Sequence, residues 1–189
     1  MHTLIVGEAP GPRGADRSGV PFLGDRAGRL VYDALVQAGC CSFPCPFEEC
    51  RSWTGKEFVE AGVFPTVTGV ALFNAYARCP TDDGTRFRAP RRREVLARHN
   101  QRRLREHLAI AAVRGLWQVC ALGTVAQRTL DPLLSAEFLL HALPHPSAQG
   151  LLQAAPDHGR GLALADLESA WVAQLVTILG GPRTARTAA

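Results

Sequence analysis

The chain of 189 residues carries 47% hydrophobic and 20% charged side chains, with a formal net charge of +4. This balance excludes a largely disordered chain and indicates one globular domain over residues 1–182, followed by a flexible tail at 183–189. No apolar run has the length of a membrane span, and Thr3–Gly7 is too short, without a basic leader, for a signal peptide. We therefore expect a soluble intracellular protein.

The predicted elements alternate between strands and helices along the chain. A buried strand at Leu4–Val6 opens into a loop rich in Gly and Pro over residues 7–24. In chain order there follow a helix over 26–39, a strand over 70–75, a long helix from 90 to about 110 and a strand over 117–122. A short helix from 124, a strand over 138–143 and a helix over 163–179, stopped by Gly180-Gly181-Pro182, complete the order.

This alternation predicts an α/β fold, a three-layer α/β/α arrangement around a central four-stranded, mainly parallel sheet. Ligands of such sheets bind where loops leave the carboxyl ends of the strands. The loop after Gly7, the segment after Asn74 and the loop with His145 all follow predicted strand ends. We therefore expect these three segments to meet at one crevice.

Gly7-Glu8-Ala9-Pro10-Gly11 places an acid directly after the first strand, in a turn with exposed backbone N–H groups. Such a turn can meet an anion or the polar edge of a base, although five residues alone are equally compatible with a structural turn. The dinucleotide-binding pattern G-x-G-x-x-G is absent, and so is the Gly-Lys-Ser/Thr of a P-loop.

A longer stretch gives this turn a context. Residues 7–28, GEAPGPRGADRSGVPFLGDRAG, resemble the first motif of the uracil-DNA glycosylase superfamily, and His145-Pro146-Ser147 resembles the second. Asn74 with Cys79-Pro80 is similar to the central strand motif, and residues 114–130 to the third strand and its following turn. The spacing from Gly7 to Phe22 matches the family 5 and single-strand-selective types, whereas the GEAPG turn is similar to family 4.

The resemblance implies a monofunctional DNA glycosylase of base excision repair. Such an enzyme hydrolyses the N-glycosidic bond of uracil, or of another deaminated base, in DNA. Its partners are DNA and the flipped base, and we expect a cytoplasmic, nucleoid-associated monomer. No lysine lies in the motifs, so Schiff-base lyase chemistry is not expected.

The chemistry of this reaction assigns further roles. Breaking the bond develops positive charge on the sugar and negative charge on the departing base, so the site needs a fixed donor and an anionic or water-orienting group. His145 fits the donor. Phe22 provides a ring to stack on the flipped base, and the amide of Asn74 pairs with O4 and N3–H of uracil.

Three acids compete for the anionic role. Glu8 stands where family 4 carries a functional glutamate and Asp25 where family 5 carries its aspartate, while Asp16 ranks third. Ala9 occupies the place of the catalytic aspartate or asparagine of other branches. Gly11 stands where branches strict for uracil place a tyrosine against C5, so hypoxanthine, xanthine or a mismatched base are further possible substrates. The substrate-binding prediction includes four residues of this segment, Gly7, Ala9, Gly11 and Asp16.

DNA contacts are expected at several other positions. Ser147 is a predicted phosphate contact, and Leu151, next to Leu152, is a predicted apolar wedge that fills the vacated stack. Nine arginines lie between residues 86 and 105. They form either a solvated helix face or a phosphate-binding stripe, and in the second case we place Arg91 and Arg92 in the stripe. A phosphate-binding stripe predicts that the affinity for DNA falls steeply with salt.

Five cysteines raise the question of a cofactor. Families 4 and 5 hold an iron–sulfur cluster with four cysteines, and Cys79 matches one ligand position, but no cysteine follows it at the usual interval. An alternative set, without the spacing that the family uses, consists of Cys40, Cys41, Cys45 and Cys50. We expect no metal and no cofactor, with a cluster from Cys79 and this set as the alternative.

A different class of function remains open at this point. A protein of the same fold that has lost the chemistry would bind DNA without turnover. A third arrangement captures the sugar covalently and stops there. Release of free base distinguishes the hydrolase from both.

Overall fold

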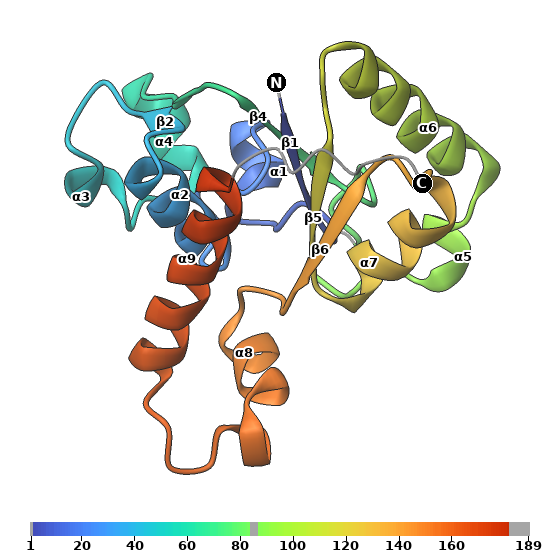
Figure 1. The fold of residues 1–189 in the computed structure, drawn as a ribbon. Helices are drawn as coiled ribbons and strands as arrows, with labels where there is room; N and C mark the ends of the chain where they lie inside the picture. Colours follow the sequence, from blue (N-terminus) through green and yellow to red (C-terminus); the bar gives the residue numbers. More distant parts are fainter. Residues whose placement is uncertain (1, 84–86, 182–189) are drawn as a thin grey trace.

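The structure is a computed structural model, and it describes residues 2–83 and 87–181 (Figure 1). The predicted flexible tail at 183–189 lies outside these residues. Four strands form one parallel sheet in the order β4-β1-β5-β6. They are β1 (Thr3–Gly7), β4 (Val70–Asn74), β5 (Gln118–Leu122) and β6 (Leu139–Leu143). The predicted four-stranded sheet is confirmed, and every pairing in it is parallel.

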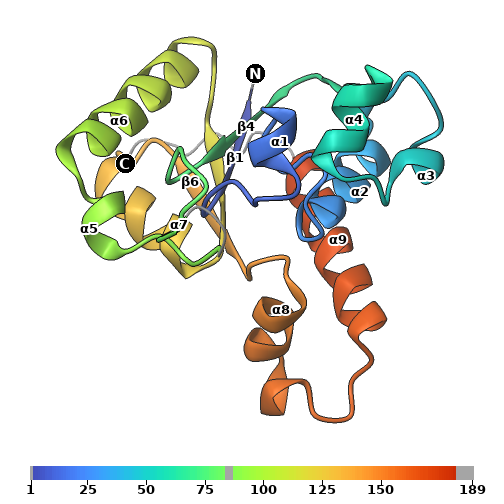
Figure 2. The ribbon, with the colours of Figure 1, turned by 180° about the vertical axis from the view of Figure 1, so that it is seen from behind.

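Helices cover both faces of the sheet (Figures 1 and 2). One layer contains α2 (Gly28–Gln37) and α9 (Leu164–Gly180), and the other contains α6 (Arg98–Val113) and α7 (Thr124–Leu130). Successive side chains of a strand point to opposite faces. Accordingly Ile5 packs in the core with α2 and α9, whereas Leu4 and Val6 pack with α6 and α7. The three-layer α/β/α prediction is confirmed.

The remaining elements are short. The helices are α1 (Ala15–Ser18), α3 (Phe47–Cys50), α4 (Gly55–Ala61), α5 (Arg92–Val95) and α8 (Ala148–Ala154), with 3-10 turns at Asp131–Leu133 and Pro156–Gly159. Strands β2 (Cys41–Ser42) and β3 (Thr66–Val67) form a small antiparallel pair. In the described part of the chain, no helix is long and apolar enough to cross a membrane.

The long helix predicted from residue 90 to 110 is wrong in one respect, because it is two helices. Ala97 has an extended backbone (φ −56°, ψ 138°) and separates α5 from α6. The amide of Asn100 donates to the carbonyl oxygens of Val95 (2.8 Å) and Ala75 (2.9 Å). A side chain thus satisfies a carbonyl that the helix break leaves open, and it ties α6 to the end of β4.

The strand ends bring the predicted site together. Gly7 at the end of β1 pairs in register with Asn74 at the end of β4. On the other side of β1, strand β5 ends at Leu122 and β6 at Leu143, two residues before His145. Because all four strands are parallel, their carboxyl ends lie at one edge of the sheet, above α8 in the view of Figure 1.

Candidate active site

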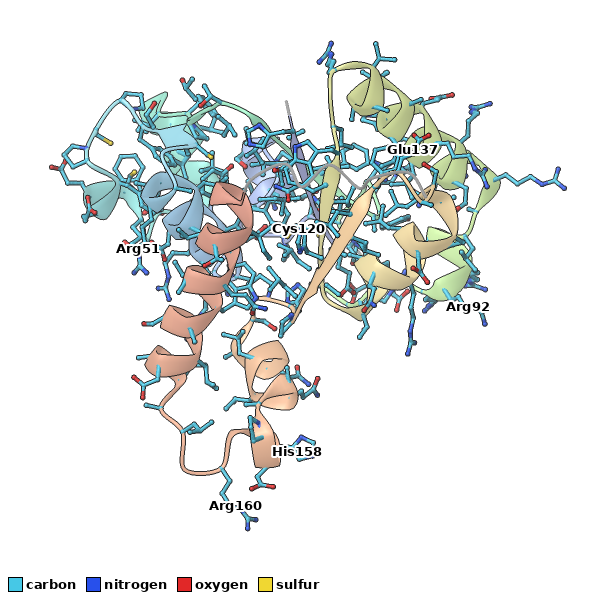
Figure 3. All side chains as sticks on the ribbon, viewed as in Figure 1. Arg51, Arg92, Cys120, Glu137, His158 and Arg160 are labelled. Carbon is cyan, nitrogen blue, oxygen red and sulfur yellow. The ribbon has the colours of Figure 1, made fainter. Side chains whose placement is uncertain are left out.

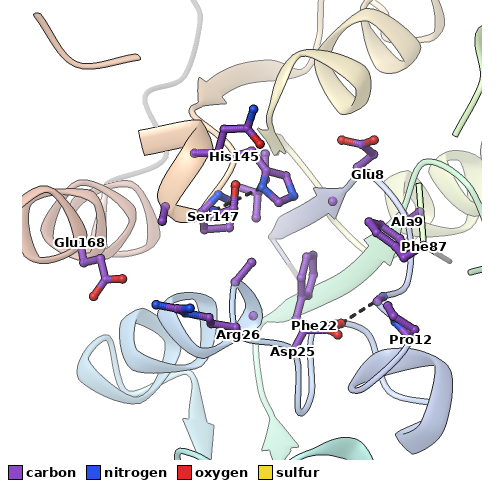
Figure 4. Close-up of a pocket in the computed structure, with 18 residues that line it drawn as sticks. Glu8, Ala9, Pro12, Phe22, Asp25, Arg26, Phe87, His145, Ser147 and Glu168 are labelled. Atoms are coloured by element: carbon purple, nitrogen blue, oxygen red, sulfur yellow. Dashed lines mark hydrogen bonds between the residues drawn. The ribbon is translucent and has the colours of Figure 1, made fainter. Parts of the chain in front are cut away.

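A cavity of about 420 Å³ opens at this edge of the sheet (Figure 4). Its walls come from the Gly7 turn, the loop around Phe22 and the start of α2, and the His145 loop with the start of α8. Eight predicted site residues line it: Gly7, Glu8, Ala9, Gly11, Phe22, Asp25, His145 and Ser147. Two of the three segments predicted from strand ends, the Gly7 turn and the His145 loop, therefore meet in one cavity, whereas Asn74 does not line it.

Phe22 adopts a backbone conformation that is rare for an aromatic residue. Its φ is +68°, in the left-handed region, and its side chain is buried. Such a conformation costs about 1–3 kcal/mol and persists only where the surroundings fix it. A Cβ on Gly7 would lie 2.5 Å from Cε1 of Phe22, so the ring rests directly on the glycine at the end of β1.

Asn74 is close to Gly7 but does not line the cavity. The same Cβ position on Gly7 is 2.8 Å from Oδ1 of Asn74, and the side chain is only 7% exposed. Asn74 lines a separate hollow together with Asp16 and Arg103. The guanidinium of Arg103 donates to the backbone oxygens of Asn74 (2.9 Å) and Ala75 (3.1 Å), which fixes the end of β4.

His145 has a defined tautomer. The backbone N–H of Ser147 donates to Nδ1 of His145 at 3.3 Å, so Nδ1 carries the lone pair and Nε2 carries the proton. Burial lowers the pKa of His145 below its ordinary value of 6.5, which keeps the ring neutral at pH 7. The ring therefore presents an N–H donor in a cavity at the sheet edge.

The loop that carries His145 is held by the start of α8. The hydroxyl of Ser147 accepts from the backbone N–H of Gly150 at 3.1 Å and caps the helix. A Cβ on Gly123 would stand 3.0 Å from Cβ of His145, so the glycine after β5 lets the histidine approach closely. Ser147 thus has a structural role in addition to its place in the cavity wall.

Asp25 is tied to the Gly7 turn. Its Oδ2 accepts from the backbone N–H groups of Gly11 (3.2 Å) and Ala15 (3.1 Å). Burial raises the pKa of this carboxyl, while the backbone hydrogen bonds act in the opposite direction. A Cβ on Gly11 would overlap the Asp25 carboxylate. The glycine and the aspartate therefore require each other, and the carboxylate holds the two loops together.

Glu8 is held differently. Burial raises the pKa of its carboxyl above the ordinary 4.5. Its backbone oxygen accepts from the N–H of Tyr76 at 2.9 Å, which fixes the main chain at this point. Its carboxylate oxygens have no hydrogen-bond or ion-pair partner among the described residues. Glu8 thus presents a half-buried carboxylate whose oxygens are available to a bound molecule.

Asp16, Arg91 and Arg92 do not line the cavity. Asp16 is exposed, on α1, and borders the hollow behind Asn74. The guanidinium of Arg91 pairs with Asp82 at 2.8 Å. Arg92 points away from the body of the protein on α5 (Figure 3), and it borders a separate hollow. The arginine run therefore contains paired and unpaired members.

The predicted wedge at Leu151 is wrong. Leu151 is 4% exposed and packs in the hydrophobic core with Leu143 and Trp171. Residue 151 lies on the face of α8 that contacts α9, where burial of an apolar side chain is favourable. A buried core residue cannot enter a DNA stack without unfolding α8 from its neighbour.

The cysteines do not form the alternative cluster. Across residues 2–83 and 87–181, no three Cys, His, Asp or Glu side chains come together as metal ligands. Burial raises the pKa of Cys41 to about 11 and that of Cys50 to about 12. An iron–sulfur cluster needs four gathered thiolates. The arrangement of Cys79 and the set at 40–50 does not fit one.

The sequence analysis did not predict several residues that line the cavity. They are Arg26, Phe87, Gln149 and Glu168. Arg26 is exposed, next to Asp25, and has no ion-pair partner in the described part of the chain. Its position inside the first motif was the one sequence feature that could have predicted its place in the cavity wall. Phe87 and Glu168 come from distant segments, and their sequence surroundings carry no indication of the site.

Comparison with known proteins agrees with this geometry. The family described as the uracil DNA glycosylase superfamily matches residues 2–167. A type-5 uracil-DNA glycosylase of Mycobacterium leprae is 51% identical over 41 residues, which are 22% of this chain and 18% of that protein. The type-5 uracil-DNA glycosylase of Thermus thermophilus is 46% identical over 41 residues, 22% and 19% of the two chains. The matched stretch thus spans about a fifth of these relatives. Because the family match covers most of the chain, the protein belongs to the uracil DNA glycosylase superfamily.

Proposed function

We propose that the protein is a monofunctional DNA glycosylase that hydrolyses the N-glycosidic bond of uracil in DNA. One observation carries this proposal: a neutral His145 with its donor N–H, the ring of Phe22 and an unpaired acid meet in one cavity at the sheet edge. The superfamily match and the two type-5 relatives support it.

His145 acts on the leaving base. As the bond breaks, negative charge grows on a base oxygen, and Nε2–H of His145 donates to it. A neutral donor suits this role because the ring stabilises the oxygen without giving up its proton and needs no counter-charge. The backbone hydrogen bond to Nδ1 fixes the orientation of the ring before the substrate arrives.

Glu8 acts on the sugar side. Its unpaired carboxylate orients a water molecule and accepts a proton from it as the water oxygen bonds to C1′ of the sugar. The bond from C1′ to the base nitrogen breaks, and the base leaves as an anion that takes up a proton. The products are free base and an abasic site. Asp25 positions the Gly7 turn through its two backbone hydrogen bonds.

DNA reaches the cavity with its target base extruded, at a cost of a few kcal/mol for unstacking. The exposed guanidinium of Arg26 lies on the side of the cavity towards Ser147 and Glu168 (Figure 4). This group is suited to a phosphate beside the flipped nucleotide. Asn74 does not line the cavity in this structure, so it would read the base edge only after a rearrangement that opens the cavity towards it.

The proposal is tested by product analysis. Purified protein is incubated with oligonucleotides that contain uracil in a single strand, opposite G and opposite A. The expected result is release of free uracil and abasic strands that break in alkali. Tight binding with no released base would favour a protein that only binds DNA, and a slow-migrating adduct on a denaturing gel would favour covalent capture. Either result would overturn the proposal that the protein is a hydrolase.

A further inference from the structure

A second hollow, of about 580 Å³, lies between α5 and α7. Both views of the ribbon place these two helices side by side, away from the cavity (Figures 1 and 2). One side of the hollow comes from residues 90–96, and the other from α7 and the 3-10 turn that follows it. Its volume is in the range of sites that take a small ligand or a few side chains of a peptide.

The lining of this hollow is largely aliphatic. Val95 is buried, Val125 is half-buried and Leu96 is 45% exposed. No aromatic ring occurs among the described lining residues. Single-stranded nucleic acid binds by stacking its bases on aromatic side chains, so this lining suits an aliphatic side chain better than a base.

Two arginines line the hollow from its two sides. Arg92 on α5 and Arg128 on α7 are both exposed, and neither forms an ion pair within the described part of the chain. The neighbouring Arg91, by contrast, pairs with Asp82 at 2.8 Å. Asp131 is the acid next to the hollow in sequence, and it pairs with neither of the two lining arginines. A guanidinium binds a carboxylate through two parallel N–H bonds, so these groups favour an acidic ligand.

Hydrogen bonds fix the α5 side of the hollow before any ligand binds. The side-chain amides of Asn100 and Gln101 both donate to the backbone oxygen of Val95, at 2.8 and 3.0 Å. The guanidinium of Arg88 makes two hydrogen bonds to Glu94 on α5, at 2.7 and 2.6 Å. A wall that is already ordered loses little conformational freedom on binding, which favours affinity.

We propose that this hollow binds an acidic peptide segment of a partner protein. An aliphatic side chain of the segment packs on Val95 and Leu96, and its carboxylates pair with Arg92 and Arg128. Charge complementarity selects this partner, because two unpaired guanidinium groups beside an aliphatic lining match a segment that combines acidic and aliphatic residues. The hollow and the active-site cavity share no described lining residue, so the bound segment leaves the cavity free for DNA. The inference does not depend on the proposed function.

Fluorescence anisotropy with a labelled peptide, Gly-Asp-Asp-Leu-Leu-Asp-Asp-Gly, tests this proposal on the whole protein. Exchange of both leucines of the peptide for alanine, or of all its aspartates for asparagine, should weaken binding about tenfold or more. Arg92→Gln and Arg128→Gln should each weaken binding about fivefold, and Leu96→Asp should weaken it further by repulsion. Arg93→Gln is the matched control, because Arg93 is exposed on the same helix but does not line the hollow. It should keep the wild-type affinity.

Several results would overturn the proposal. No binding of the acidic peptide at millimolar concentration would do so, and so would an equal loss in Arg93→Gln, which would indicate attraction by overall charge. If single-stranded DNA displaced the peptide and lost as much affinity in Arg92→Gln and Arg128→Gln, the hollow would be a phosphate site instead.

The rate of uracil release provides a separate control. It should be unchanged by saturating peptide, whereas inhibition would place the peptide in the cavity and contradict the inference. Absence of uracil release by the wild type would overturn the proposed function, but it would leave peptide binding and its dependence on Arg92 and Arg128 as they are.

Discussion

At the scale of single residues, burial sets the protonation states in the cavity. Desolvation lowers the pKa of His145 and raises that of Glu8, and neither shift needs a charged neighbour. The two pKa values therefore approach each other: His145 loses its charge at a pH below 6.5, and Glu8 gains its charge at a pH above 4.5. The hydrogen bonds of Asp25 to two backbone N–H groups set this acid apart from Glu8.

The first prediction separates the two acids. The rate of base release should fall on the acid side as pH drops through the raised pKa of Glu8, at an apparent pKa above 4.5. Glu8→Gln should lose roughly 10²–10⁴-fold in rate and remove this limb of the profile. Asp25→Asn should keep the limb and lose stability, since its amide cannot accept both backbone bonds as strongly. Single-turnover rates over pH and thermal unfolding measure these effects. If Asp25 were the catalytic acid instead of Glu8, the acid limb of the pH profile would disappear in Asp25→Asn and persist in Glu8→Gln.

At the scale of elements, the sheet edge and the short helix α8 place the site. Ser147 caps α8 and fixes His145 through its backbone N–H, while Leu151 one turn later packs on α9. The indole of Trp171 on α9 donates to the oxygen of Pro144 at 2.9 Å, which holds the loop from the other side. The position of His145 thus depends on contacts between α8 and α9.

The second prediction follows from this packing. Leu151→Ala should lower the free energy of unfolding by about 2–5 kcal/mol, as for other buried leucines. Leu152→Ala, at the half-buried neighbouring position, should cost clearly less. Urea unfolding of both variants compares them. If Leu151→Ala kept wild-type stability and only DNA binding were weakened, the result would contradict the core role of Leu151 and support the predicted wedge.

Sequence patterns predict the elements better than the details of the site. The strands and the motifs after them follow from apolar runs and glycines, and these place Gly7, Phe22 and His145 together. The break at Ala97 depends on a side-chain bond from Asn100 to Val95, which no periodicity encodes. Glu8 and Asp25 cannot be separated without knowing which carboxylate meets backbone N–H groups.

At the scale of the whole molecule, part of the positive charge behind the net charge of +4 is used in contacts within the protein. Arg88 and Arg91 form ion pairs with acidic side chains, and Arg103 donates a hydrogen bond to the backbone at the end of β4. Arg26 is unpaired among the described residues and lies at the cavity. The arginine run alone therefore overstates the charge available to phosphates, because part of it is used within the fold.

The third prediction concerns salt. Affinity for single-stranded DNA should fall linearly with ionic strength on a double-logarithmic plot. Arg26→Gln should reduce the slope by about 1, as expected for loss of one phosphate contact. Arg91→Gln should change it little, because Asp82 already neutralises Arg91. Fluorescence anisotropy at several salt concentrations measures the slopes. Equal reductions of the salt slope in Arg26→Gln and Arg91→Gln would contradict this prediction and indicate that the arginine run contacts DNA.

The most direct test of the account is the rate of uracil release by His145→Ala. His99→Ala is the matched control, because His99 is exposed on α6 and lies outside the cavity. The account predicts that His145→Ala is slower than wild type by about 10²–10³-fold, the usual effect of losing one preorganised donor, while His99→Ala is unaffected. Full activity in His145→Ala would contradict it.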